Sequence, residues 1–178
     1  VFDALVEQIA DTVLRARASS QPIRLAVRRS TTEGLVVNRV DPRGPVDPEL
    51  IVCALYPLRS REPLAVLINF AAHPTALGAW NVQLSADYPG VVARHLEAWW
   101  PSATCLFLAG AVADQAPVKR GDGFERAEWL GRQLAEQAIA LLDRAEPLAP
   151  RRLLARQETL TLPPAAVRLG RWLTLPRW

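Results

Sequence analysis

The sequence contains no methionine, a single lysine (Lys119), only two cysteines and only two histidines among its 178 residues. Two cysteines are too few for a disulfide framework or for a cysteine zinc site. Cys53 and Cys105 both lie in apolar segments, where a thiol behaves as a small buried hydrophobic group. No apolar run approaches the roughly 20 residues that a membrane span needs, so no transmembrane helix is predicted.

The chain begins at Val1 and lacks methionine, so we expect its start to be missing through processing, through the choice of expressed segment or because the chain is a fragment. Its first residues do not show the basic region, apolar stretch and cleavage site of a signal peptide, and no compartment is predicted. The sequence does not predict an oligomeric state.

Positive charge is almost entirely arginine and is spread along the chain, with a formal net charge of +3. This distribution does not predict a nucleic-acid partner. The exception is the tail of residues 168–178, in which arginine is mixed with Trp172 and Trp178. Such a tail could contact a membrane surface or nucleic-acid bases, although a frayed chain end or an unpaired strand is the more frequent interpretation.

Half of the residues are apolar, which is enough for one domain with a substantial core. Helical spacing of apolar residues predicts three helices: residues 2–17, a segment from Ser85 or Asp87 to Pro101, and residues 124–144. Apolar runs predict strands at residues 23–29, 50–56, 64–72, 104–108 and 153–162. The polar turn between the second and third strands predicts a β-hairpin. Together these elements predict an α/β fold (mixed α+β), with a mixed β-sheet layered with helices.

His73 directly follows residues 64–72, a nearly unbroken apolar segment that is typical of a strand covered on both faces. Pro74 ends regular pairing there because it has no N–H to donate. Loops at the ends of buried strands often carry catalytic groups or metal ligands, although an isolated histidine more often has a structural role. The long connection of residues 74–85 favours a binding loop.

Two other polar residues are weaker candidates for a functional site. His95 shares the apolar stripe of its predicted helix, which favours core packing over metal binding. Asp114 lies in a turn of small residues, 109–117, that lets the backbone approach a ligand or a metal loop closely. Its carboxylate could bind there or cap the turn, and turn capping is the more frequent use.

Three segments resemble the N-terminal catalytic domain of neutral/alkaline non-lysosomal ceramidases and their bacterial relatives. The family's histidine-bearing strand end is matched by NFAAHPTALG and the SADYPG helix start. Its later strand and Gly-Asp turn are matched by CLFLAGAVADQAP, and its upstream Asn-Arg and Asp-Pro-Glu elements by VVNRVDPRGPVDPEL. The match covers about residues 1–150 and leaves residues 151–178 as a final strand and basic tail. We therefore expect residues 1–178 to be a single fragment of such a domain.

The resemblance implies a mixed sheet layered with helices and hydrolysis of the amide bond of an N-acyl sphingoid lipid at a zinc ion. Zinc lowers the pKa of a bound water to about 7 and stabilises charge on a carbonyl oxygen. The HPT motif implies that His73 is a zinc ligand, with Asp114 orienting the site from the adjacent turn. A small-molecule amide or lipid is then the expected partner.

The chain departs from the family's pattern in three respects. The position of the serine implicated in catalysis is Ala116, and the second arginine of the Asn-Arg-Arg element is Val40. The family's His-Thr-His zinc segment would precede Val1, and its Glu and Tyr ligands would follow Trp178. We expect this incomplete domain to be inactive on its own. The alternative is a catalytically silent relative that acts as a structural or lipid-contacting domain.

Overall fold

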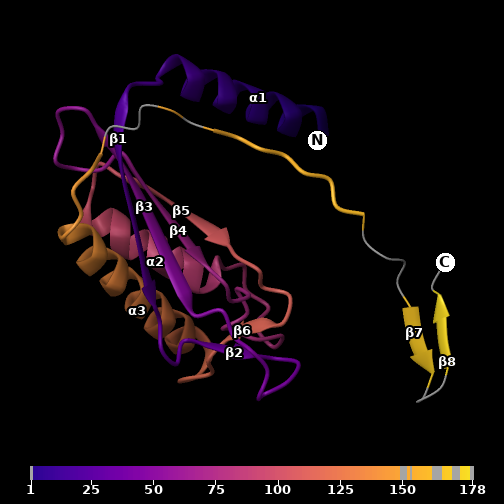
Figure 1. Cartoon of the computed structure of the whole chain (residues 1–178). Coiled ribbons are helices and arrows are strands. Elements are labelled where there is room, and N and C mark those ends of the chain that lie inside the picture. Colours follow the sequence, from indigo (N-terminus) through magenta and orange to yellow (C-terminus); the bar gives the residue numbers. More distant parts are fainter. Residues whose placement is uncertain (1, 149–151, 153, 162–165, 170–172, 177–178) are drawn as a thin grey trace.

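The computed structural model describes residues 2–148, 152, 154–161, 166–169 and 173–176. Within these residues helices and strands are mixed along the chain (Figure 1). The elements are α1 (Phe2–Ala18), β1 (Ile23–Thr31), β2 (Val36–Asn38), β3 (Glu49–Pro57), β4 (Ala65–Phe70), α2 (Asp87–Trp99), β5 (Thr104–Ala109), β6 (Gln115–Pro117), α3 (Gly123–Asp143), β7 (Ala166–Leu169) and β8 (Leu173–Pro176).

A four-stranded sheet in the order β1-β3-β4-β5 forms the centre of the fold. β3 pairs antiparallel with both β1 and β4, so the predicted hairpin is confirmed. β4 and β5 pair in parallel, with α2 as the connection that returns the chain to the same end of the sheet. The predicted mixed α/β fold class is therefore confirmed.

One face of this sheet is covered by α2 and α3 (Figure 1). Strand residues alternate between buried and half-buried positions, as the two-residue period of a strand dictates. The buried strand residues pack against apolar residues of the two helices. The largest side chains of the resulting core include Leu50, Val52, Ile68, Phe70, Tyr88, Leu96, Leu130 and Leu134. Burial of each large apolar side chain contributes about 1.5–3 kcal/mol, which makes this layer the main stabilising core.

The opposite face of the sheet, here called the open sheet face, is also apolar. Register aligns Val27, Cys53, Leu67 and Leu106 in one row across all four strands. Val27 and Leu106 are 48% and 50% exposed, and no described helix packs over this row. The expectation that residues 64–72 are covered on both faces is therefore wrong for the described residues. An apolar run shows that both faces are apolar, but it does not show what covers them.

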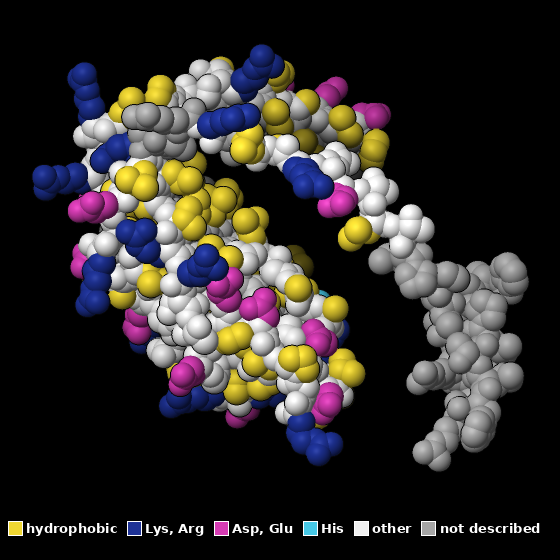
Figure 2. Space-filling model, in the orientation of Figure 1, with side chains coloured by type: hydrophobic (Ala, Val, Ile, Leu, Met, Phe, Trp, Pro, Cys, Tyr) yellow, Lys and Arg dark blue, Asp and Glu magenta, His cyan; other side chains and the backbone are white. Residues whose placement is uncertain are grey.

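α1 confirms the predicted N-terminal helix, but none of its residues is buried. Its large apolar side chains are between 49% and 76% exposed. Figure 2 shows hydrophobic side chains gathered along this helix. The exposed set comprises Phe2, Leu5, Val6, Ile9, Val13 and Leu14. The described part of the chain thus has two apolar surfaces without a partner, one on α1 and one on the sheet.

The predicted strand at residues 153–162 is wrong for residues 154–161, which have no regular structure. The alternation there has no neighbouring strand to pair with, and pattern alone does not supply one. The candidate membrane contacts Trp172 and Trp178 lie outside the described residues. In the described part of the chain, no helix combines the length and hydrophobicity needed to cross a bilayer.

Gly131 sets the distance between α2 and α3. A Cβ atom at this position would lie 2.4 Å from Val91 Cβ and 2.8 Å from the Tyr88 carbonyl oxygen. Replacing Gly131 with alanine should therefore destabilise the protein by about 1–3 kcal/mol through overpacking, despite the better helix propensity of alanine. Urea unfolding followed by circular dichroism measures this change.

Ala140, an exposed position of the same helix, provides the control. Ala140→Gly should cost only the propensity difference of about 1 kcal/mol. A Gly131→Ala protein more stable than the wild type would show that the helices separate without penalty.

Candidate functional site

The parallel pairing of β4 and β5 brings the His73 loop and the Asp114 turn together where the two strands end, and these strand ends are here called this edge of the sheet. The chain leaves β4 towards His73 and leaves β5 towards the turn that contains Asp114. Gly110 N–H donates to the Phe70 carbonyl at 3.1 Å, and a Cβ on Gly110 would lie 3.1 Å from Ala71 Cβ. Glycine thus allows the two strand ends to approach closely, and a larger residue would require Ala71 to shift. The sequence predicted both loops but not this pairing.

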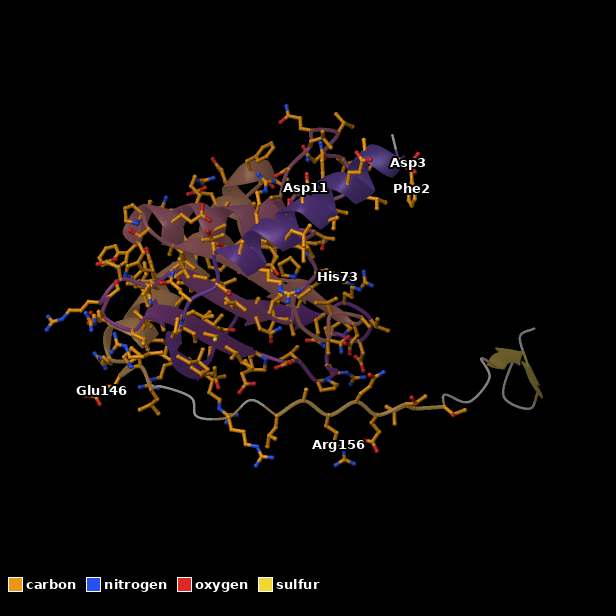
Figure 3. All side chains as sticks on the ribbon, turned by 90° about the horizontal axis from the view of Figure 1, so that it is seen from above. Phe2, Asp3, Asp11, His73, Glu146 and Arg156 are labelled. Atoms are coloured by element: carbon orange, nitrogen blue, oxygen red, sulfur yellow. The ribbon has the colours of Figure 1, made fainter. Side chains whose placement is uncertain are left out.

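His73 is half-buried just after β4 (Figure 3). Its backbone N–H donates to the Gln115 carbonyl at 3.2 Å, and its own carbonyl accepts from Thr75 N–H at 2.8 Å. Within the described residues, the two ring nitrogens have no hydrogen-bond partner. The backbone of His73 is therefore fixed against the Asp114–Gln115 turn while its imidazole keeps its donor and acceptor capacity.

The Asp114 carboxylate is held by two amide side chains. Asn38 donates to Oδ2 at 2.9 Å and Gln115 donates to Oδ1 at 2.8 Å. The hydrogen bond from Gln115, assisted by Asn38 and by the charge of Arg39, holds the pKa of Asp114 below its usual value. Asp114 is accordingly an anion at neutral pH, tied into the turn.

Asn38 and Gln115 face each other in the β2–β6 pair and are both buried. Asn38 Oδ1 accepts from the N–H groups of Val40 and Asp41 at 3.0 Å each, and Gln115 Oε1 accepts from Asp47 N–H at 3.0 Å. These two amides fasten the loop of residues 39–48 to the site. Sequence reasoning missed Gln115, because only its pairing with β2 makes a polar residue necessary there.

Asp87, expected from the sequence only as a residue at the start of α2, is buried and has a positive φ of 53°. Its carboxylate accepts from Ala76 N–H at 3.2 Å and from Leu77 N–H at 3.0 Å. Ser85 Oγ accepts from Asp87 N–H at 3.0 Å, but neither residue caps α2, because Ala86 is the N-cap and has no side-chain cap hydrogen bond. The start of α2 is therefore joined to the loop that follows His73.

Tyr88 is fully buried beneath the same loop. Its hydroxyl donates to the carbonyl of Ala72, the residue before His73, at 2.5 Å. Its ring meets Phe107 edge-to-face with 5.4 Å between centroids. Burial, with a smaller contribution from the Asp87 charge, raises the pKa of Tyr88 far above its usual value, so the hydroxyl stays protonated.

The described residues do not form a complete metal site. No group of three or more His, Cys, Asp or Glu side chains in the described ranges could hold a metal ion. A zinc ion needs at least three protein ligands in a catalytic site, and His73 alone does not meet that requirement. The described residues could supply at most one ligand of a zinc site, and no catalytic step through zinc follows from them.

Two surface hollows lie near this edge of the sheet. The larger, about 580 Å³, is lined by residues at the starts of α2 and α3, including Arg94, Phe124 and Glu128. The smaller, about 340 Å³, lies against the loop after His73 and is lined by Thr75 and Asp87 among others. Neither hollow is lined by His73 or Asp114.

His95 does not pack in the core as expected. It is half-buried, and its Nε2 lies 3.0 Å from Glu128 Oε1 on α3. Arg94 also pairs with Glu128, and Arg132 approaches it at 3.5 Å. His95 lies at the margin of the apolar stripe of α2, where a polar ring reaches the surface of the neighbouring helix.

Glu128 gives this cluster a dependence on pH. The hydrogen bond from His95, and then those from Arg94 and Arg132, lower the pKa of Glu128 despite opposing desolvation. A carboxylate with a lowered pKa in the folded state stabilises the fold above its unfolded pKa of about 4.3. That stabilisation is lost as the pH falls through the lower folded pKa.

We therefore expect Glu128→Gln to lower stability near neutral pH and to lose less stability than the wild type on acidification. Chemical unfolding at a series of pH values from 7 to about 3 measures both effects. Glu136→Gln, at an exposed position of α3, is the control and should follow the wild-type curve. Parallel curves for wild type and Glu128→Gln would contradict the assignment.

No protein-family model matches the chain, and no curated protein matches it. Solved structures do match, and two of them cover most of the chain. Neutral ceramidase from Pseudomonas aeruginosa gives a TM-score of 0.69 at 21% identity, over 82% of this chain and 26% of that chain. A structure of ceramidase complexed with C2 gives 0.70 at 20% identity, with the same coverage. The chain therefore spans about a quarter of the length of these structures and shares their fold over that part.

Proposed function

We propose that this chain is part of a ceramidase-like zinc-dependent amide hydrolase, in which His73 supplies one ligand to the metal. The observation that carries the proposal is the position of His73. Its ring nitrogens have no partner in the described residues, and its backbone is fixed beside the Asp114–Gln115 turn. This edge belongs to a fold shared with neutral ceramidase.

The remaining metal ligands would come from polypeptide outside residues 1–178. One observation supports an incomplete domain: the open sheet face exposes apolar side chains that a folded domain normally covers. The parallel β4–β5 pair points the same way, since parallel strands are usually covered on both faces. Residues 1–178 would then be one fragment of a single domain.

The proposed substrate is an N-acyl sphingoid lipid or a related amide, by analogy with the named ceramidases. Asp114 would act by orienting the turn beside His73, because both of its carboxylate oxygens already accept hydrogen bonds from Asn38 and Gln115. Residues 1–178 alone would be inactive. The tail containing Trp172 and Trp178 would at most add contact with a membrane surface.

A second candidate is a catalytically silent relative with a structural or lipid-contacting role. Ala116 favours it, because this residue on β6 has no hydroxyl where the resemblance places the serine implicated in catalysis. The two candidates differ in whether a metal is bound at His73.

Metal analysis separates the two candidates. In a longer protein that includes residues 1–178, His73→Ala should reduce bound zinc from about one equivalent to well below half and abolish amidase turnover. The matched control is His95→Ala, because His95 is engaged by Glu128 on the helices and should keep both zinc and turnover. Zinc content measured by atomic emission, together with hydrolysis of an N-acyl sphingoid amide, provides the readouts.

Unchanged zinc content in His73→Ala would exclude His73 as a ligand. Absence of zinc from the longer wild-type protein would instead favour the silent relative.

A further inference from the structure

We propose that Asp87 and Tyr88 are positioning residues that hold His73 for ligand binding. This inference rests on the proposed function, because it gives these residues a role through the His73 imidazole. Both lie at the start of α2, and both bind backbone groups on either side of His73.

Tyr88 restrains the chain immediately before His73. Its hydroxyl donates to the Ala72 carbonyl, while its ring is buried and packed edge-to-face on Phe107 of β5. A hydroxyl on a ring that cannot move is a fixed point for the carbonyl that it contacts. The peptide unit between Ala72 and His73 is thereby oriented from beneath.

Asp87 restrains the chain after His73, and its own backbone conformation is unusual. Its φ of 53° lies in the left-handed region, which a residue other than glycine adopts only when its surroundings fix it. Here the fixing groups are Ser85, which accepts from Asp87 N–H, and the amides of Ala76 and Leu77, which donate to the carboxylate. In this conformation the carboxylate lies within hydrogen-bonding distance of the Ala76 and Leu77 N–H groups.

The anchoring is confined to the part of the loop nearest His73. Beyond it, Trp80, Val82 and Leu84 are exposed to 96%, 96% and 104% of their reference areas. Arg126 of α3 adds a third contact, to the Ala76 carbonyl at 3.3 Å. A loop that only needed to be closed would gain more by burying these large apolar side chains. The contacts instead fix the residues that determine where the His73 ring points.

The peptide bond before His73 is therefore held at both its carbonyl oxygen and its N–H. Tyr88 holds the carbonyl before it, and the Gln115 carbonyl accepts its own N–H. A fixed backbone sets the position and direction of the Cα–Cβ bond that carries the imidazole, and such preorganisation favours binding of a metal or other ligand.

The test uses the full 178-residue chain, NMR of the two histidine rings, and titration with Zn²⁺ alone. His95→Gln assigns the two sets of ring signals, because the chain has only two histidines. The test variants are Tyr88→Phe and Asp87→Asn. The control is Tyr56→Phe, a buried tyrosine at the end of the sheet where β4 begins rather than ends.

In both test variants we expect the His73 ring signals to move towards those of an unrestrained histidine. The Zn²⁺ concentration that half-saturates the His73 shift should rise about tenfold, which is typical for loss of a residue that orients a ligand. Far-ultraviolet circular dichroism should remain that of the folded chain. Tyr56→Phe should change neither the ring signals nor the Zn²⁺ response.

Unchanged His73 signals and Zn²⁺ response in folded Tyr88→Phe and Asp87→Asn proteins would overturn the inference. If these variants do not fold, hydrogen exchange of the wild type decides. The Ala76 and Leu77 amides must then exchange far more slowly than those of residues 79–84, and equal rates would overturn it. If the wild-type His73 does not respond to Zn²⁺, as its incomplete ligand set allows, the ring signals alone decide the inference, because they report the positioning without a metal.

Discussion

The parallel hydrogen bonding of β4 to β5 is the constraint on which the rest of the arrangement depends. Parallel strands end at the same edge of a sheet, so the loops after them emerge side by side. The crossover through α2 then supplies both a cover for the core face and, at its first turn, the groups that fasten the His73 loop. The β4–β5 pairing thus positions the core, the candidate metal ligand His73, and the residues Asp87 and Tyr88 that hold its loop.

Polar side chains, rather than apolar burial, order the loops at this edge. Asn38, Gln115 and Asp87 are buried, and each satisfies backbone amides that would otherwise lack a partner. A buried amide or carboxylate with specific partners fixes a loop in one conformation, because any other conformation leaves it unsatisfied. This edge therefore has defined geometry even though much of it faces solvent.

The sequence was sufficient to predict the helices, the hairpin and the mixed fold class, because these follow from periodicity and turn composition. It placed His73 at a strand end for the same reason. It did not predict the β4–β5 pairing, which depends on segments that are far apart along the chain. His95 was misassigned because a helical stripe does not show where its margin meets solvent. Gln115 gave no local signal, since its role comes from a strand that precedes it by many residues.

The two outer strands of the main sheet, β1 and β5, differ in how readily a further strand could pair with them. The β1 edge carries Arg28 and Arg29 and is bridged at Leu25 by Leu148, features that discourage further pairing. The β5 edge, Thr104–Ala109, carries no charge and no proline, and no described strand lies beyond it. Among the described residues β5 is therefore the edge with fewer obstacles to a further strand, although Glu97 already accepts from Cys105 N–H and Asn69 donates to the Leu108 carbonyl.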